Sequence, residues 1–258
     1  MFTAAGFAKT WEYIDLFKQG LLCTVMLSIF TVVFGFALAL VLALLRMSNF
    51  RPFSFLGITK DGRLRNQGVL TAISRFNPLS FLACAYVEIF RATPMLVQLF
   101  IIYYVVLGDV SLPSFKLFGT IRFDRFLPGV IALSMNSGAY LSEIIRSGIQ
   151  SIDGGQTEAA RSLGLSQAKN MRYIILPQAI KNILPPIANE FVTIIKESSI
   201  CYTIGVQEIM SAVTSIRGAS FRIAEPLVIA ACVYFCLTFP TSKIIAYFER
   251  RMSSGDKR

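Results

Sequence analysis

A long run without any charged side chain extends from Leu21 to Leu45. At about 1.5 Å per residue, a helix over this run is longer than the ~30 Å hydrocarbon core of a bilayer. A run of this length and composition is typical of a membrane-spanning helix. The chain is therefore expected to fold in a membrane, where a helix satisfies the backbone hydrogen bonds of each span internally.

The composition supports a membrane protein and excludes several functions. Apolar residues make up 54% of the 258 residues and charged residues only 16%, whereas a soluble domain carries about 25% charged residues. The net charge of +10 does not indicate nucleic-acid binding, because the basic residues lie between apolar runs, as the positive-inside rule expects. The chain has no histidine, and its five cysteines are interpreted as small apolar residues within the spans. We predict neither a metal site nor a catalytic residue.

Apolar runs separated by basic segments predict an all-α polytopic membrane protein with about five transmembrane helices. The aromatic-rich segment 1–20 is expected to lie at the external membrane interface. Basic residues cluster in the first and second long connections and in the C-terminal tail, which places the N-terminus outside and the C-terminus in the cytoplasm. The expected spans are approximately residues 21–45, 79–107, 126–147, 178–200 and 226–248, with cytoplasmic loops at 49–77 and 151–177.

Several of these spans carry polar or charged side chains. A charge at the bilayer centre costs about 2.5–3.5 kcal/mol, so such side chains face protein or water. Glu88 and Arg91 are three residues apart and can pair on one helix face, and Pro94 is expected to bend the helix after them. Two interpretations stay open for such groups, namely packing within the bundle and lining a passage for a polar solute. The candidates for the passage are Glu88, Arg91, Ser134, Asn136, Glu143, Glu190 and Thr193.

The segment from Asp153 to Pro177 lies between two apolar runs but is polar, basic and rich in small residues. It predicts two short helices joined at Gly164, because glycine commonly ends or bends a helix. Thr157 is expected to cap the first helix and Ser166 the second, and Pro177 is expected to end the second helix.

Within this segment, Ala159 and Ala160 leave so little side-chain bulk that another protein could approach closely. With Glu158 before them, Gly164 after them and the later Ile174, Leu176 and Pro177, their spacing resembles the EAA loop of the membrane subunits of ABC importers. The resemblance implies a type I ABC importer transmembrane domain over residues 21–258, in which this loop is the coupling helix that docks on a cytoplasmic ATPase. The coupling residues that it implies are Glu158, Ala159, Ala160, Arg161, Leu163, Gly164 and Leu165.

The resemblance covers nearly the whole chain. The runs 88–100, 137–146 and 189–199 are similar to those of the polar amino acid permeases of ABC importers, although Ala92 stands where that family usually has glycine. This implies a multi-pass protein of the bacterial cytoplasmic membrane, surrounded by lipid, that takes an amino acid substrate. The implied partners are a second permease subunit, identical or paralogous, a cytoplasmic ABC ATPase dimer and an extracytoplasmic solute-binding protein.

The chain itself lacks the glycine-rich phosphate loop of an ATPase. We therefore expect a permease subunit that is not an enzyme and binds no cofactor, with ATP and Mg²⁺ bound by the partner ATPase. Two other functions stay open. Glu88, Glu143 and Glu190 could be proton or sodium sites of a secondary transporter driven by an ion gradient, although no internal repeat is detected. A non-transporting membrane scaffold is not excluded either.

Overall fold

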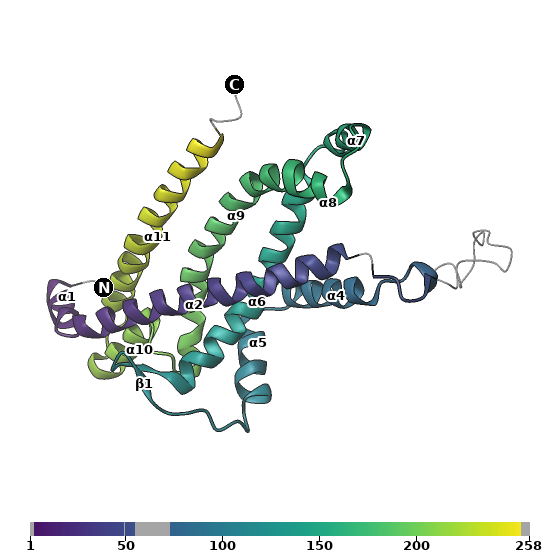
Figure 1. Ribbon diagram of the computed structural model, residues 1–258. Helices are drawn as coiled ribbons and strands as arrows, with labels where there is room; N and C mark the ends of the chain where they lie inside the picture. Colours follow the sequence, from purple (N-terminus) through teal and green to yellow (C-terminus); the bar gives the residue numbers. More distant parts are fainter. Residues whose placement is uncertain (1–2, 49, 55–72, 254–258) are drawn as a thin grey trace.

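The structure, a computed structural model shown in Figure 1, describes residues 3–48, 50–54 and 73–253. Most of the predicted loop at 49–77 lies outside the described residues. From the N-terminus, the first elements are α1 (Ala4–Trp11), α2 (Ile14–Met47), α4 (Pro78–Ala92), α5 (Met95–Phe100), the π-helical η2 (Ile101–Val106), β1 (Lys116–Leu117) and β2 (Ile121–Arg122). They are followed by α6 (Phe123–Gln150), α7 (Gly154–Ser162), α8 (Gln167–Asn170), the π-helical η3 (Met171–Ile175), α9 (Leu176–Glu197), the 3₁₀-helical η4 (Ser198–Ile204), α10 (Ile209–Ser220) and α11 (Ala224–Ser253).

The apolar runs of the sequence form long helices, as predicted. Within the described ranges, α2 and α11 are each long and apolar enough to cross a membrane alone. A third span is present if α4 and the α5–η2 helix are counted as one, and the helix direction changes by 110° between these two parts. The bend lies at Thr93 and Pro94, where proline was predicted to bend the helix. The count of five spans and their orientation stay predictions.

Helices α2 and α6 pack through small residues, which form the centre of the bundle. A Cβ atom added to Gly138 of α6 would lie 2.9 Å from Cδ2 of Leu38 in α2. A Cβ atom added to Gly35 of α2 would lie 3.4 Å from the backbone oxygen of Ser134 in α6. Small residues let helix backbones approach closely in a membrane, where dispersion contacts stabilise the packing.

Helices α6 and α9 meet near the two ends that the segment between them connects. The position of a Cβ atom on Gly148 lies only 2.3 Å from Cγ1 of Ile183, so only glycine fits there. Ala179 and Ile183 of α9 pack with Leu141 and Ile145 of α6 in one apolar cluster. The Asn182 side chain also donates a hydrogen bond to the Ser151 hydroxyl, 2.9 Å away. The two helices are therefore closely packed at this point.

The predicted connector at 201–224 contains α10, which packs between α2 and α11. The side chain of Glu208 caps α10 by accepting a hydrogen bond from the Ser211 amide at 2.9 Å, and Tyr234 of α11 donates to its other oxygen at 2.7 Å. The Glu208 carboxyl is completely buried. Gly20 of α2 lies against the backbone of Glu208. A Cβ atom added to Gly20 would be only 2.9 Å from the Glu208 carbonyl. Glu208 thus connects three helices, a role that the sequence analysis did not find.

Candidate functional site

The predicted coupling segment contains α7 and α8, and Figure 1 shows α7 at one end of the molecule, beyond the ends of α6 and α9. Asp153 caps α7 by accepting a hydrogen bond from the Gly155 amide at 2.8 Å. The prediction that Thr157 caps this helix was wrong. Helix α7 begins earlier, because Asp153 supplies the capping oxygen before the two glycines, and Thr157 lies inside the helix. There its hydroxyl accepts a hydrogen bond from Asn170 of α8 at 3.2 Å.

Gly164 ends α7, as predicted, and does so through a left-handed backbone with φ = +78°. Its amide donates to the Arg161 carbonyl at 2.9 Å, and the Leu165 amide donates to the Ala160 carbonyl at 3.0 Å. This pair of bonds is the Schellman motif, which satisfies the last carbonyls of a helix and favours glycine at the left-handed position. The turn at Gly164 therefore fixes the direction in which the chain leaves α7.

The second predicted helix starts as expected but does not end as expected. Ser166 caps α8 by accepting a hydrogen bond from the Lys169 amide at 3.4 Å. Pro177 does not end it, because η3 continues directly into α9 and Pro177 occupies the first turn of α9. Pro177 has no amide hydrogen to donate, but the backbone is helical on both sides of it. The coupling segment is thus continuous with α9 rather than separated from it.

The predicted coupling residues divide by exposure into an outer and an inner group. Leu163 is an apolar side chain that is 83% exposed, and Ala160 is only 1% exposed. Ala160 faces inward, and Leu165 is half-buried. Among the large apolar side chains of the described residues, Leu163 is one of the most exposed. The outer group consists of Glu158, Ala159, Arg161, Leu163 and Gly164.

The passage candidate Asn136 belongs to a buried hydrogen-bond network at the 110° bend. The side-chain amide of Gln98 donates to the Phe90 carbonyl at 2.7 Å, to the Thr93 carbonyl at 3.0 Å and to the Thr93 hydroxyl at 2.7 Å. Asn136 of α6 donates to the Gln98 side-chain oxygen at 2.8 Å. Gln98 thereby satisfies carbonyls that Pro94 leaves without a helical partner, as the membrane requires. The sequence analysis did not identify Gln98. A side-chain amide four residues after a proline within a predicted span was the signal that could have indicated it.

Two further passage candidates make contacts between helices. The Ser134 hydroxyl is buried and lies 3.4 Å from the Thr31 carbonyl of α2. Glu143 pairs with Arg46 of α2 at 2.7 Å and with Arg146 on its own helix. The pair with Arg46 joins α2 to α6 close to their predicted cytoplasmic ends. The described contacts of both residues are therefore contacts within the protein.

The other four passage candidates lie on two helices and are more accessible. Glu88 and Arg91 on α4 are exposed. In the part of the chain that the structure describes they form no ion pair with each other, so the predicted pairing was wrong. The Arg91 guanidinium instead lies over the ring of Tyr140 at 5.6 Å from its centroid, an arrangement stabilised by the ring quadrupole. Glu190 and Thr193 are half-buried on α9, three residues apart and thus on one face.

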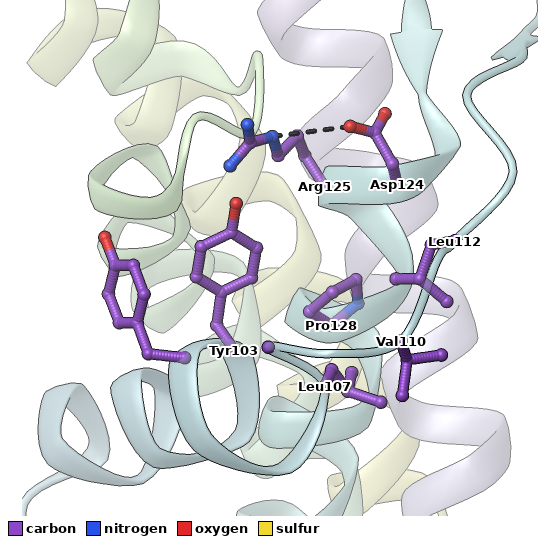
Figure 2. A pocket seen from close by; sticks show the side chains of 9 residues that line it. Tyr103, Leu107, Val110, Leu112, Asp124, Arg125 and Pro128 are labelled. Carbon is purple, nitrogen blue, oxygen red and sulfur yellow. Dashed lines mark ion pairs between the residues drawn. The ribbon is translucent and has the colours of Figure 1, made fainter.

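A separate cavity of about 290 Å³ lies where η2 meets the start of α6. Figure 2 shows Arg125 between Asp124 and Tyr103 at its edge. The Arg125 side chain pairs with Asp124 at 3.4 Å, stacks on the Tyr103 ring at 5.2 Å and donates to the Ile204 carbonyl at 3.3 Å. Arg125 thus connects η2, α6 and η4. Among the described residues, no group of three or more His, Cys, Asp or Glu side chains could hold a metal ion.

Comparison with known proteins decides the family. Residues 67–254 match the family described as the inner membrane component of binding-protein-dependent transport systems. The chain belongs to this family. It is 36% identical to the arginine transport system permease protein ArtQ of Bacillus subtilis, over 97% of this chain and 98% of that protein. It is 41% identical to a putative glutamine transport system permease protein GlnP of Rickettsia typhi, over 72% of this chain and 82% of that protein.

Solved structures agree with this membership. A crystal structure of an amino acid ABC transporter with histidines has a chain that is 37% identical and superposes with a TM-score of 0.79, over 97% of this chain and all of that chain. An inward-facing structure of the MetNI methionine ABC transporter is only 17% identical, with a TM-score of 0.64 over 93% of this chain and 97% of that chain, and shows the shared fold. This permease is therefore an all-α, multi-pass protein of the bacterial cell membrane with the type I fold, and a non-catalytic subunit, as predicted.

Two glycines of the permease give a matched test of the turn after α7. A Cβ atom at Gly154 or at Gly164 would meet nothing within 4 Å, but only Gly164 has a positive φ. We expect Gly164→Ala to destabilise the turn by about 1–2 kcal/mol, the cost of a left-handed residue with a Cβ atom, and Gly154→Ala to have no such cost. Hydrogen exchange of the α7 amides in detergent measures both variants. Equal protection of α7 in the two variants would contradict the role assigned to the turn.

Proposed function

We propose that this permease is the membrane-spanning subunit of an ATP-driven importer of polar amino acids, and that α7 docks on a cytoplasmic ATPase. The observation that carries the proposal is the position of the coupling segment. Its outer group presents Leu163 at 83% exposure, while Ala160 and Leu165 anchor α7 on its inner side. A fixed helix with an exposed apolar side chain is suited to docking in a groove of a partner.

The attachment of α7 explains how ATPase movement would reach the membrane. The coupling segment follows α6 in the chain and continues through η3 into α9. Gly148 and Ile183 hold these two helices in close contact at its base. A displacement of α7 would therefore move α6 and α9 together, because packed helices shift as units between discrete arrangements. Helix α9 carries Glu190 and Thr193, so the movement would alter the proposed passage.

The relatives and the accessible polar residues support the proposed substrate class. ArtQ is named for arginine, GlnP for glutamine, and another relative, NocM of Agrobacterium fabrum, for nopaline. We assign the passage to Glu88, Arg91, Glu190 and Thr193, which offer both charges and a hydroxyl to a zwitterionic solute. Ser134, Asn136 and Glu143 are assigned to packing, since each forms a hydrogen bond or an ion pair with a group of another helix.

The proposal includes three protein partners. A dimeric ATPase that binds ATP and Mg²⁺ supplies the energy, since the chain lacks a phosphate loop. A second permease subunit, identical or paralogous, completes the passage. A solute-binding protein delivers the amino acid on the external side, as the description of the family as binding-protein-dependent supports.

The docking of α7 is tested by Leu163→Asp, with Val110→Asp as the matched control. Both residues are exposed and apolar, but Val110 lies in the connection before β1, at the other end of the chain's fold. We expect Leu163→Asp to reduce the ATPase that co-purifies with the tagged permease about tenfold or more, because a central interface anchor is replaced by a desolvated charge. Mass spectrometry and ATP hydrolysis quantify the bound partner.

The control variant should retain as much ATPase as the wild type. Wild-type protein that captures no ATPase, under conditions that preserve a known transporter complex, would contradict the proposed function. Uptake that depends on an ion gradient rather than on ATP would then favour the secondary transporter.

A further inference from the structure

Two phenylalanines have a backbone conformation that phenylalanine rarely adopts. Phe118 has φ = +50° and Phe221 has φ = +55°, and among the described residues no other non-glycine residue has a positive φ. Both side chains are also unusually exposed, at 67% for Phe118 and 93% for Phe221. A bulky side chain in this region of the backbone map is strained, and little packing of either ring offsets the strain.

The local structure shows that other residues would suit these positions better. Phe118 and Gly119 are the central residues of the turn between β1 and β2, closed by a hydrogen bond from the Thr120 amide to the Leu117 carbonyl at 3.1 Å. A turn with two central positive φ angles favours asparagine or glycine. Phe221 ends α10, and its amide donates to the Arg217 carbonyl at 2.9 Å. Glycine or asparagine is again the favoured residue there.

Both rings lie at the end of the molecule opposite to α7. Figure 1 shows the β1 hairpin and α10 at the lower left, whereas α7 is at the upper right. The hairpin residues Leu117 and Ile121 pack in the same apolar cluster as Ile204 and Val206, which lead into α10. If α7 is cytoplasmic, this end is external.

The surroundings of the rings favour a protein surface over lipid. Lys116 and Arg122 flank Phe118 on the hairpin and both are exposed, but Arg122 is paired with Asp124 at 2.7 Å, so Lys116 is the cation of the hairpin that is offered to a partner. Arg217 is exposed one helical turn before Phe221. Lipid headgroup regions enrich tryptophan and tyrosine rather than phenylalanine. A partner that fits here offers apolar pockets bordered by carboxylates, so that its rim complements these cations.

We propose that Phe118 and Phe221 are two aromatic anchors that dock the solute-binding protein on the external side of the permease. This inference rests on the proposed function and adds the residues that make the contact. Residues held in sparsely populated backbone conformations cluster at functional sites. Aromatic side chains also supply much of the binding free energy at protein interfaces.

The inference predicts that relieving the strain improves folding while it weakens docking. Asparagine tolerates the left-handed conformation, so we expect Phe118→Asn and Phe221→Asn to raise the melting temperature, by roughly 2–4 °C for each kcal/mol of strain relieved. Each change should weaken the affinity for the substrate-loaded binding protein about tenfold or more. A structural role for the rings would lower both quantities or leave docking unchanged.

The experiment uses the complete transporter in nanodiscs. Its probe is the substrate-loaded solute-binding protein that stimulates ATP hydrolysis by the wild-type complex. Affinity is measured by biolayer interferometry and stability by thermal unfolding. Val110→Asn, an exposed apolar residue with ordinary backbone angles on the same external connection, is the matched control and should bind like the wild type. Phe118→Gly and Phe221→Gly provide a second pair of variants in case an asparagine variant does not fold.

Each outcome separates the inference from the proposed function. Weaker docking with unchanged or raised stability supports the aromatic anchors. Unchanged affinity in both single variants and in the double variant overturns them, and a lowered stability in that case would assign the rings to the lipid surface. Failure of any binding protein to stimulate the wild-type complex would contradict the proposed function itself.

Discussion

The close contact between α6 and α9 is the constraint on which the connection of α7 to the helix bundle depends. At Gly148 the backbone of α6 approaches Ile183 so closely that a side chain would overlap with it. The surrounding cluster adds Ala179, Leu141 and Ile145, so the two helices cannot move apart without opening an apolar interior. Helices α7 and α8 connect α6 to α9 in the chain. The exposed coupling surface is therefore attached at both ends to closely packed helices. A partner that moves α7 thereby acts on the bundle.

A second constraint comes from the membrane, which leaves no water for backbone groups. The chain breaks a helix at Pro94 and must satisfy the carbonyls that the break exposes. Gln98 does so, and Asn136 holds Gln98 from α6. Arg46 and Glu143 connect α2 and α6 by an ion pair at another position along these helices. Polar residues that looked like a passage in the sequence therefore serve in part as connections between helices.

The sequence was sufficient wherever a local rule determined the structure. Uncharged runs predicted the long helices, Gly164 predicted the end of α7, Ser166 the cap of α8 and Pro94 the bend. The sequence was not sufficient where distant or competing groups determine the structure. Asp153 displaced Thr157 as the cap, and the partners of each polar side chain depend on helix packing that no local pattern reveals.

The charged residues illustrate this limit. Glu88 and Arg91 have the spacing of an ion pair, but Tyr140 from another helix provides the arginine with a different neighbour. Glu208 looked like part of a connector, yet it is buried and bonded to Tyr234. The family resemblance, in contrast, was visible in the sequence because it rests on fixed spacings within single segments.

The most direct test of the account is a distance measurement between α7 and α9 within one chain. Spin labels on Ser162→Cys and Leu184→Cys, both at exposed positions, are compared by pulsed electron resonance with and without trapped ATP, after Cys84, Cys232 and Cys236 are replaced by alanine. The account predicts the same distance distribution in both states of an active transporter, because α7 and α9 move as one unit. A shift of about 5 Å, one helical turn, would show that the coupling segment is hinged and would contradict it.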